Sequence, residues 1–398
     1  MGAHGKTRRL LRVFAVPLLL GGVLTGLGST AASAATAPAC QAWTGGQPAN
    51  PGDIDSGDSL SGVAMLSACN VWVAGVRGDR HTLIEHWTGG STWTVVPSPS
   101  PGAGFNSLTS INGVSPTDIW AVGTDSNADG SVEQGLILHW NGTSWSQTPS
   151  PNPGKFVQLT AVHEISASDA WAVGTYTTDT GTTTLTLHWD GTSWTQKPSP
   201  NPGPGANSEL TSVTATSGGD VWAVGDFISN TQNVAVSTLV MHWDGTSWKQ
   251  ADSPNPEPDS IDRLTGVSAT SPNDAWAVGF FANGTADQTL ILHWDGTSWT
   301  QKPSPDPFED DNLSGVAATS AGSAVAVGTG QTAAHGGRNV TLALRWDGTA
   351  WTQAPSIQLG GTDTGDFLNG VSAISATEAW AVGFFGPTPT QTLAFHFK

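Results

Sequence analysis

Five oxygen-bearing side chains recur at every second position of one short segment, and they are Asp125, Asn127, Asp129, Ser131 and Glu133. Calcium prefers carboxylate, amide and hydroxyl oxygens, and a tight loop can turn alternate residues inward. Gly130 permits a sharp bend between the third and fourth of them. The spacing predicts a structural calcium site that stiffens this loop, although Leu136 stands where an EF-hand loop carries its last glutamate. The alternative is an acidic, solvated turn.

His163 and Glu164 are a second pair of residues that could carry chemistry. Related segments of the chain have small residues at the first of these positions, such as Ala64, Thr214 and Ser268. An imidazole and a carboxylate can titrate or bind a ligand. Neighbouring residues of a strand point to opposite faces, so these two are not expected to act together. We take them as ligand-binding candidates, with a packing role as the alternative.

The other polar residues show no catalytic constellation. We find no Ser-His-Asp arrangement, no phosphate-binding loop and no further metal-ligand cluster, so the residues favour a protein that is not an enzyme, with an enzyme kept as the alternative. One repeated position holds histidines, namely His86, His139, His188, His242, His293 and His396. Another holds acids, namely Asp118, Asp169, Asp220, Asp274 and Glu378. An architecture requires such residues in every repeat, so we predict packing and turn-capping roles for both sets.

A repeat of about 50 residues positions all of these groups. A leucine precedes a tryptophan by twelve residues in each of seven units, as Leu264 precedes Trp276, with Val325 in place of the tryptophan once. Each unit holds four short strand-like runs, which in the fifth unit are residues 264–269, 275–279, 289–294 and 298–301. A Trp-Asp-Gly-Thr sequence between the last two is typical of a hairpin turn. The pattern predicts an all-β, seven-bladed β-propeller with four antiparallel strands per blade, in one domain of residues 35–398. The repeated tryptophans are expected to pack between blades.

The seventh unit ends after its third strand, and residues 41–44 match the missing fourth one. We therefore expect the N-terminal strand to complete the last blade, which leaves no open sheet edge. Cys40 precedes that strand, and Cys69 lies in the first turn of the first blade, on the same face. In an exported chain the two cysteines predict a disulfide, with two free thiols as the alternative.

Residues 1–34 have the pattern of a secretory signal peptide. Basic residues precede an apolar stretch at residues 13–27, and Ala32-Ser33-Ala34 offers a cleavage site. The stretch is too short to span a membrane, so we expect a secreted, extracellular protein exported by the general or the twin-arginine route. The net charge of −18 argues against a nucleic-acid partner, because phosphate binding needs a basic surface.

Two segments of the fifth unit, Trp-Ala-Val-Gly at residues 276–279 and His-Trp-Asp-Gly-Thr-Ser-Trp at 293–299, carry a family resemblance. Over residues 39–398 the chain resembles the secreted, tryptophan-rich β-propellers of actinobacteria. The resemblance implies fold and export, but little about activity, because that group mostly lacks an assigned function. The loop at residues 125–133 also resembles the nine-residue calcium loops of integrin-type propellers, which occur in several blades there and in one here.

Three classes of function remain. We favour a secreted, monomeric binding module for an extracellular glycan or protein, which would use the variable loops or tryptophan-lined pockets between blades. A carbohydrate-active hydrolase or lyase is the second class, and it needs two converging acids. The candidate acids are Asp226, Glu209, Asp179 and Asp366. A structural protein of the cell surface is the third.

Overall fold

The structure is a computed structural model that describes residues 41–52, 57–202, 207–228, 235–332, 337–360, 364–387 and 389–398. These residues belong to one compact unit, Cys40–Lys398. The predicted signal peptide and Cys40 lie outside the described residues. Within the described part, no helix is long and apolar enough to cross a membrane.

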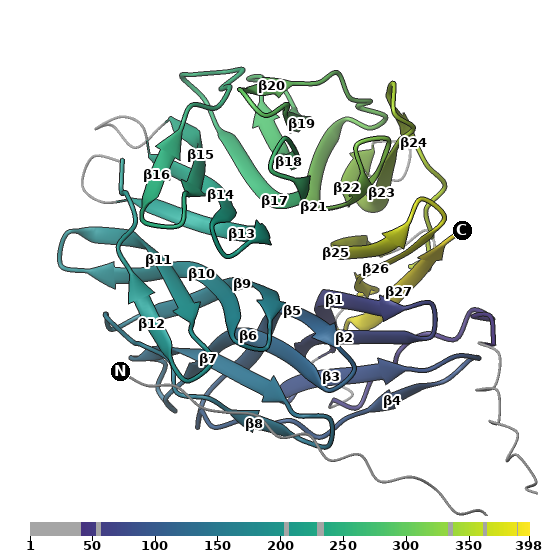
Figure 1. The fold of residues 1–398 in the computed structure, drawn as a ribbon. Coiled ribbons are helices and arrows are strands. Elements are labelled where there is room, and N and C mark those ends of the chain that lie inside the picture. Colours follow the sequence, from purple (N-terminus) through teal and green to yellow (C-terminus); the bar gives the residue numbers. More distant parts are fainter. Residues whose placement is uncertain are drawn as a thin grey trace, which may run out of the picture. The chain divides into compact units, whose positions relative to one another are not determined.

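Seven antiparallel sheets stand around a central opening, each as one blade of a β-propeller (Figure 1). The described strands of each blade are hydrogen-bonded in chain order. The first strands line the opening, and they are β1 (Ser59–Ser67), β5 (Asn106–Ser115), β9 (Val157–Ser166), β13 (Ser208–Ser217), β17 (Asp262–Ser271), β21 (Asp310–Ser320) and β25 (Asp366–Ser375). The predicted seven-bladed, all-β fold is therefore confirmed.

The remaining strands follow outwards within each blade. The second strands are β2 (Asn70–Val76), β6 (Asp118–Ser126), β10 (Asp169–Thr178), β14 (Asp220–Ile228), β18 (Asp274–Ala282), β22 (Ser323–Thr332) and β26 (Glu378–Phe385). The third strands are β3 (Thr82–Trp87), β7 (Glu133–Trp140), β11 (Gly181–Trp189), β15 (Val236–Trp243), β19 (Asp287–Trp294), β23 (Arg338–Trp346) and β27 (Gln391–Phe397). The fourth strands are β4 (Trp93–Val95), β8 (Trp145–Gln147), β12 (Trp194–Lys197), β16 (Trp248–Ala251), β20 (Trp299–Gln301) and β24 (Trp351–Gln353).

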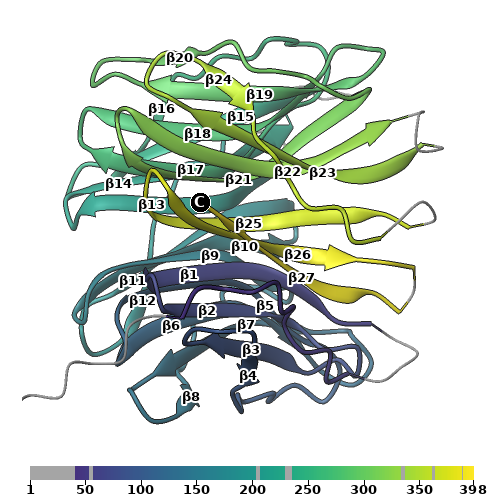
Figure 2. The same ribbon diagram turned by 90° about the vertical axis from the view of Figure 1, so that its right-hand side faces the viewer.

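The strands run between two faces of the ring, which Figure 2 shows from the side. We call the face with the first-to-second and third-to-fourth connections the turn face, and the other the loop face. On the turn face, Asp190 accepts the backbone N–H groups of Thr192 and Ser193 and the Thr192 hydroxyl. These hydrogen bonds lower the pKa of Asp190 to about 2. Gly191 has a φ of 89°, a conformation that suits glycine and completes the predicted hairpin turn.

Tryptophan triads join neighbouring blades. Trp120 of the second blade contacts Trp189 and Trp194 of the third, with ring centroids 5.0 and 5.2 Å apart. The same contact is made by Trp72 with Trp140 and Trp145, Trp171 with Trp243 and Trp248, Trp222 with Trp294 and Trp299, Trp276 with Trp346 and Trp351, and Trp380 with Trp87 and Trp93. Between the sixth and seventh blades Val325 and Phe397 replace the triad in the core. The tryptophans pack between blades, as the repeat predicted.

The repeated histidines and acids form pairs beside these tryptophans. His139 Nε2 lies 2.6 Å from Asp118 Oδ1, and the imidazole stacks on Trp120 at a centroid distance of 4.1 Å. The other pairs are His188–Asp169, His242–Asp220, His293–Asp274 and His396–Glu378. The histidines are structural, as predicted, but the acids bind histidine rather than cap their own turns. Serine hydroxyls accept the turn N–H groups, for example Ser115 from Thr117.

A threonine near the start of each of four first strands connects its blade to the next one. The Thr265 hydroxyl lies 3.1 Å from the carbonyl oxygen of Val278 in its own blade and 2.7 Å from that of Leu313 in the next. Thr109, Thr160 and Thr211 make equivalent contacts. Between the seventh and first blades Asn369 Nδ2 donates to the carbonyl of Leu60 at 2.8 Å. These bonds join neighbouring first strands at five of the blade junctions.

The seventh sheet differs from the prediction, because its described strands are β25, β26 and β27 alone. Residues 41–44 form no strand. The following residues still lie along β27, but they bind it through side chains. Asn50 Oδ1 accepts the N–H of Thr392 at 2.7 Å, and Gln47 Oε1 accepts that of Ala394 at 2.8 Å.

The position of Trp43 accounts for this difference. Its ring packs edge-on against Trp380 of the seventh blade at 5.3 Å, beside the first blade. Its repeat equivalent Trp299 instead packs on Trp222 of the preceding blade. In the other blades a short turn joins the third and fourth strands and sets their register. No such turn joins residues 41–44 to β27, so Trp43 is free to take the other side of the sheet.

Candidate functional site

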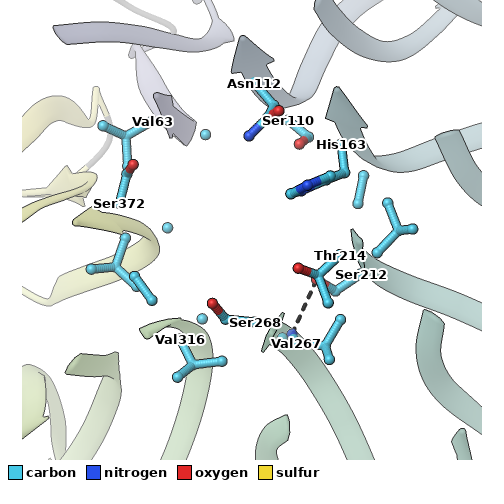
Figure 3. Close-up of a pocket in the computed structure, with 18 of the residues that line it drawn as sticks. Val63, Ser110, Asn112, His163, Ser212, Thr214, Val267, Ser268, Val316 and Ser372 are labelled. Carbon is cyan, nitrogen blue, oxygen red and sulfur yellow. Dashed lines mark hydrogen bonds between the residues drawn. The ribbon is translucent and has the colours of Figure 1, made fainter. Parts of the chain in front are cut away.

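A channel of about 370 Å³ runs between the seven first strands. Figure 3 shows its wall, with Ser110, Asn112, Thr214, Ser268 and Ser372 around the open centre. The innermost strand of each blade has no further strand beside it, so its free backbone groups must find other partners. The polar wall residues supply them.

Six polar side chains of the wall accept a backbone N–H from the next blade, and they are Ser110, Asn112, Ser212, Thr214, Ser268 and Ser372. Ser268 Oγ accepts that of Ala318 at 3.0 Å, and Asn112 Oδ1 accepts that of Glu164 at 2.8 Å. Ser372 binds Met65 in the same way, across the junction of the last and first blades. The polarity of the channel is therefore explained by the architecture without a ligand.

His163 is the one titratable residue among those that line the channel, and its imidazole points into the centre (Figure 3). Removal from water lowers the pKa of His163 to about 4. A hydrogen bond to the backbone of Ala215 acts in the opposite direction but is the smaller effect. The ring is therefore neutral at pH 7, and it can offer a ligand one hydrogen bond but no charge.

Glu164 points away from the channel, as its alternation with His163 predicts. It is 3% exposed, and its Oε2 accepts the N–H of Val114 at 3.0 Å. Burial raises its pKa to about 8, with a further contribution from the negative charge of Asp118. His163 and Glu164 are thus separated by the strand, and Glu164 belongs to the contact between the second and third blades.

The predicted calcium loop is held by its own hydrogen bonds. Asn127 Oδ1 accepts the N–H of Val132, and Asp129 Oδ1 accepts that of Ser131. Asn127 Nδ2 donates to Ser131 Oγ, and Glu133 turns to Gln158 of the third blade. Asp125 is 8% exposed, and burial raises its pKa.

Four of the five predicted ligands are therefore engaged in hydrogen bonds with the protein. Within the described residues, no group of three or more His, Cys, Asp or Glu side chains is arranged to hold a metal ion. This geometry favours a hydrogen-bonded turn, and calcium stays a prediction with its own test.

The cysteine pairing also stays a prediction, because Cys40 lies outside the described residues. Its chain neighbour Gln41 lies beside Cys69. A Cβ placed on Gly89 would stand 3.2 Å from Cys69 Sγ and 3.4 Å from the backbone N of Gln41. The chain thus approaches Cys69 at the residue that follows Cys40, as a disulfide requires.

A polar pocket of about 240 Å³ opens on the loop face between the fifth and sixth blades. Its lining residues are Asp287, Asp310, Asn312, Thr329, Gly330, Gln331 and Asn339. The two acids come together because Asp310 Oδ1 accepts the backbone N–H of Asp287 at 2.9 Å. Asn312 Nδ2 lies 3.4 Å from Asp287 Oδ2. The ring of Phe308 packs against Gly330, where a side chain would collide with it.

Two of the four acids considered for catalysis meet on the loop face. Glu209 and Asp226 are cross-strand partners, and Arg263 Nε of the next blade lies 3.6 Å from Asp226 Oδ2. Burial raises the pKa of Asp226 to about 6, Arg263 opposes this shift, and Glu209 adds to it. Asp366 instead caps the N–H groups of Leu359 and Gly360. Asp179 is exposed in the turn before β11.

The sequence interpretation missed Arg263 and the pocket residues, although a signal was present. The residue before the repeated leucine changes from blade to blade, and it reads Ser59, Ser107, Gln158, Glu209, Arg263, Asn312 and Phe367. A position that varies within an otherwise regular repeat serves no common structural need. It therefore marks the rim of the channel on the loop face as a candidate binding region.

No model of a known protein family matches the chain, and neither does a curated protein sequence. Solved structures do share its fold. YCF48 bound to a D1 peptide has a TM-score of 0.52 at 14% identity, over 88% of this chain and 97% of that one. YCF48 from Cyanidioschyzon merolae gives 0.52 at 13%, over 88% and 98%. A protein of unknown function from Dyadobacter fermentans gives 0.51 at 12%, over 88% and 96%.

At sequence identities this low, the similarity to these structures shows a shared fold and nothing about function. The chain is a seven-bladed β-propeller, and its function has to be argued from its own residues.

Proposed function

We propose that this protein is a secreted binding module that holds an extracellular glycan on its loop face. The observation that carries the proposal is the pocket between the fifth and sixth blades, where Asp287, Asp310 and Asn312 converge. Carboxylates accept hydrogen bonds, and amides both donate and accept them, as the hydroxyl groups of a sugar require. Phe308, which packs partly buried against the core and against Gly330, supports this polar set from behind.

The tryptophans give the glycan proposal less support than the pocket does. Trp294 lines a cleft of about 380 Å³ with Thr297 and Ser298. However, its Nε1 donates to the carbonyl of Pro272, and its ring packs against Trp222 and Trp299. The ring is thus already engaged as core, so we place the glycan in the loop-face pocket.

The test begins with a glycan array probed with the mature chain, residues 35–398. Affinity for the best-retained glycan is then measured by calorimetry for wild type, Asn312→Ala and Asp310→Asn. We expect each substitution to weaken binding about tenfold, because each removes a hydrogen-bonding group worth about 1.4 kcal/mol.

Ser107→Ala is the matched control, because Ser107 holds the position of Asn312 in the second blade, away from the pocket. It should bind as wild type does. An array that retains no glycan, or equal affinity in Asn312→Ala, would count against the proposal.

Secretion is tested separately. N-terminal sequencing of the protein from culture medium should give a chain that begins at Ala35, after the predicted cleavage site. Protein that stays in the cell with Met1 intact would contradict this part of the proposal.

A second candidate function is glycan hydrolysis or cleavage by Glu209 and Asp226. It is favoured by one observation, the raised pKa of Asp226 beside a second carboxyl group, a pattern found at acid–base sites. Release of reducing ends from polysaccharides by wild type, and its loss in Asp226→Asn, would support catalysis. Binding without release would leave the module as proposed first.

A further inference from the structure

The next-to-last residue of each first strand lies at the turn face, and its type divides the blades into two groups. In the fourth, fifth and sixth blades this residue is Thr216, Thr270 or Thr319. In the seventh, first, second and third blades it is Ile374, Leu66, Val114 or Ile165. These four aliphatic residues, which we call the aliphatic crescent, lie in consecutive blades, because β25, β1, β5 and β9 contact one another in that order.

The position lies in a β-bulge in each of these blades. In the second blade, for example, Gly113 pairs with Ile119 and Ser115 with Asp118, which leaves Val114 unpaired between them. The equivalent shift surrounds Ile374 in the seventh blade and Thr270 in the fifth. A bulge aims its side chain away from the regular alternation of the strand.

The aliphatic residues lack a hydrogen bond that two of the three threonines make. The hydroxyls of Thr216 and Thr270 donate to Asp220 and Asp274, the acids of the histidine pairs. Valine is close to threonine in size and shape, so space does not explain the exchange at Val114. Val114 is 48% exposed and Ile374 43% exposed, whereas Leu66 and Ile165 are half-buried against the core. Val114 and Ile374 are thus exposed on either side of the half-buried Leu66, where a threonine would be the more soluble choice, and this indicates a contact surface.

The charges beside the aliphatic crescent indicate the kind of partner. Asp118, Asp169 and Glu378 each stand four residues after a member of it. No first-to-second turn contains Lys or Arg. The basic residues described at the other turn-face connections are Lys249, already paired with Asp244, Arg345 in the sixth blade, and Lys398 beyond β27. The chain as a whole carries −18. Asp118, Asp169 and Glu378 each contact a histidine through one oxygen and stay partly exposed, so they present negative charge beside the aliphatic crescent. Such a surface is complementary to a cation with aliphatic groups.

We propose that the aliphatic crescent docks a cationic, aliphatic segment of a partner protein. Aliphatic side chains of the segment would cover Val114 and Ile374, and its Lys or Arg side chains would meet Asp118, Asp169 and Glu378. The site lies on the turn face, so it is separate from the glycan pocket on the loop face and does not depend on the glycan proposal.

The probe is a fluorescein-labelled hexapeptide of alternating Lys and Leu, titrated with the mature chain by fluorescence anisotropy at 20 and at 300 mM salt. The comparison peptides alternate Glu with Leu and Lys with Ser. We expect saturable binding of the Lys/Leu peptide that weakens with salt, because added ions screen exposed charges. Each comparison peptide should bind at least about tenfold more weakly, since it lacks one of the two contacts.

The decisive variant is Val114→Thr with Ile374→Thr, which introduces the residue that three other blades carry at this position. We expect at least tenfold weaker binding of the Lys/Leu peptide, with unchanged circular dichroism and unchanged glycan binding. The matched control is Val95→Thr with Ile261→Thr, because both residues are 37% exposed at other places on the surface. It should bind the peptide as wild type does.

Three results would overturn the proposal. They are equal peptide affinity in wild type and the Val114→Thr/Ile374→Thr variant, equal affinity for the Glu/Leu peptide, and absence of saturable binding to wild type.

Discussion

Glu164 shows how one residue can depart from a repeat and still serve the architecture. It is 3% exposed between the second and third blades, accepts the N–H of Val114, and lies near Asp118. Asp118 in turn binds His139 at 2.6 Å. The buried carboxyl is held in its protonated form near neutral pH by burial and by this neighbouring charge.

Glu164→Gln should therefore change how stability depends on pH. The pKa of Glu164 rises from 4.5 to about 8 on folding, so the folded chain keeps a proton that the unfolded chain loses between these values. The free energy of unfolding of wild type should fall as pH rises from about 4.5 to about 8, by about 1 kcal/mol or more. Glutamine keeps an acceptor for Val114 and never ionises.

Urea unfolding at pH 5 and pH 9 measures this effect. We expect the two proteins to be similar in stability at pH 5, and Glu164→Gln to be the more stable at pH 9. The same pH dependence in both would show that Glu164 is ionised in the folded protein.

Pairs of neighbouring elements are held together by groups that the repeat presents at the same place in most blades. Tryptophan triads fill the space between sheets, and threonine hydroxyls join one first strand to the next. Each blade leaves the inner edge of its first strand without a strand partner, so the side chains of its neighbour supply the missing hydrogen bonds. A single blade would lack these partners, and this is why the repeat is stable only as an array.

Thr265→Val tests the connection between the fifth and sixth blades. Valine keeps the branched shape but removes the hydroxyl that lies 2.7 Å from the Leu313 carbonyl. We expect the free energy of unfolding to fall by about 1–2 kcal/mol, measured by urea titration, because a buried acceptor loses its donor. Thr319→Val is the control in the next first strand, since the Thr319 hydroxyl makes no hydrogen bond within the described residues. Equal losses in the two variants would argue against the inter-blade bond.

The loop at residues 125–133 can be tested for calcium by thermal unfolding of the mature chain in calcium and in a chelator. A metal that binds only the folded state raises the midpoint. A higher midpoint in calcium, lost in Asp129→Ala, would establish the site and would require Asn127 and Asp129 to exchange their N–H donors for the ion. Equal midpoints are the outcome that the hydrogen bonds of the loop favour.

Closure of the whole ring depends on contacts between residues far apart in the chain. Asn50 binds Thr392, Gln47 binds Ala394, and Asn369 binds Leu60. Six blades obtain their fourth strand through a local hairpin, whereas the seventh is covered by residues from the other end of the chain. The seventh blade therefore has the weakest local support for its outer edge.

Asn50→Ala tests this support, with Asn201→Ala as the matched variant. Asn201 makes the same bond within one blade, to the N–H of Thr184 at 2.8 Å. Asn50→Ala removes one hydrogen bond, and Asn201→Ala removes the equivalent one together with a weaker bond of 3.3 Å from Asn201 Nδ2 to the Ser199 carbonyl. Each substitution should therefore lower the free energy of unfolding by about 1–2 kcal/mol. Asn50→Ala alone should also speed amide hydrogen exchange throughout β25–β27, because it loosens a long-range closure. Exchange that rises only at Thr392 would show that other contacts suffice to close the ring.

The sequence by itself determined the number of blades, the four-strand order of six of them and the hairpin turns. Each of these depends on residues close together in the chain, such as the spacing from Leu264 to Trp276 and the Asp-Gly-Thr turns. Alternation along a strand also predicted that His163 and Glu164 would separate. The structural roles of the repeated histidines and tryptophans followed from their recurrence.

Only the tertiary structure decided the side of the sheet that Trp43 occupies, the meeting of Asp287 with Asp310, and the contact of Glu164 with Asp118. Each depends on the register or packing of segments from different strands or blades, and a one-residue change moves a side chain to the other face. The aliphatic crescent likewise becomes a surface only when four distant bulges are brought side by side. Hydrophobic and hydrogen-bonding pattern along the chain defines a blade, but the contacts between blades define the places where this protein can bind.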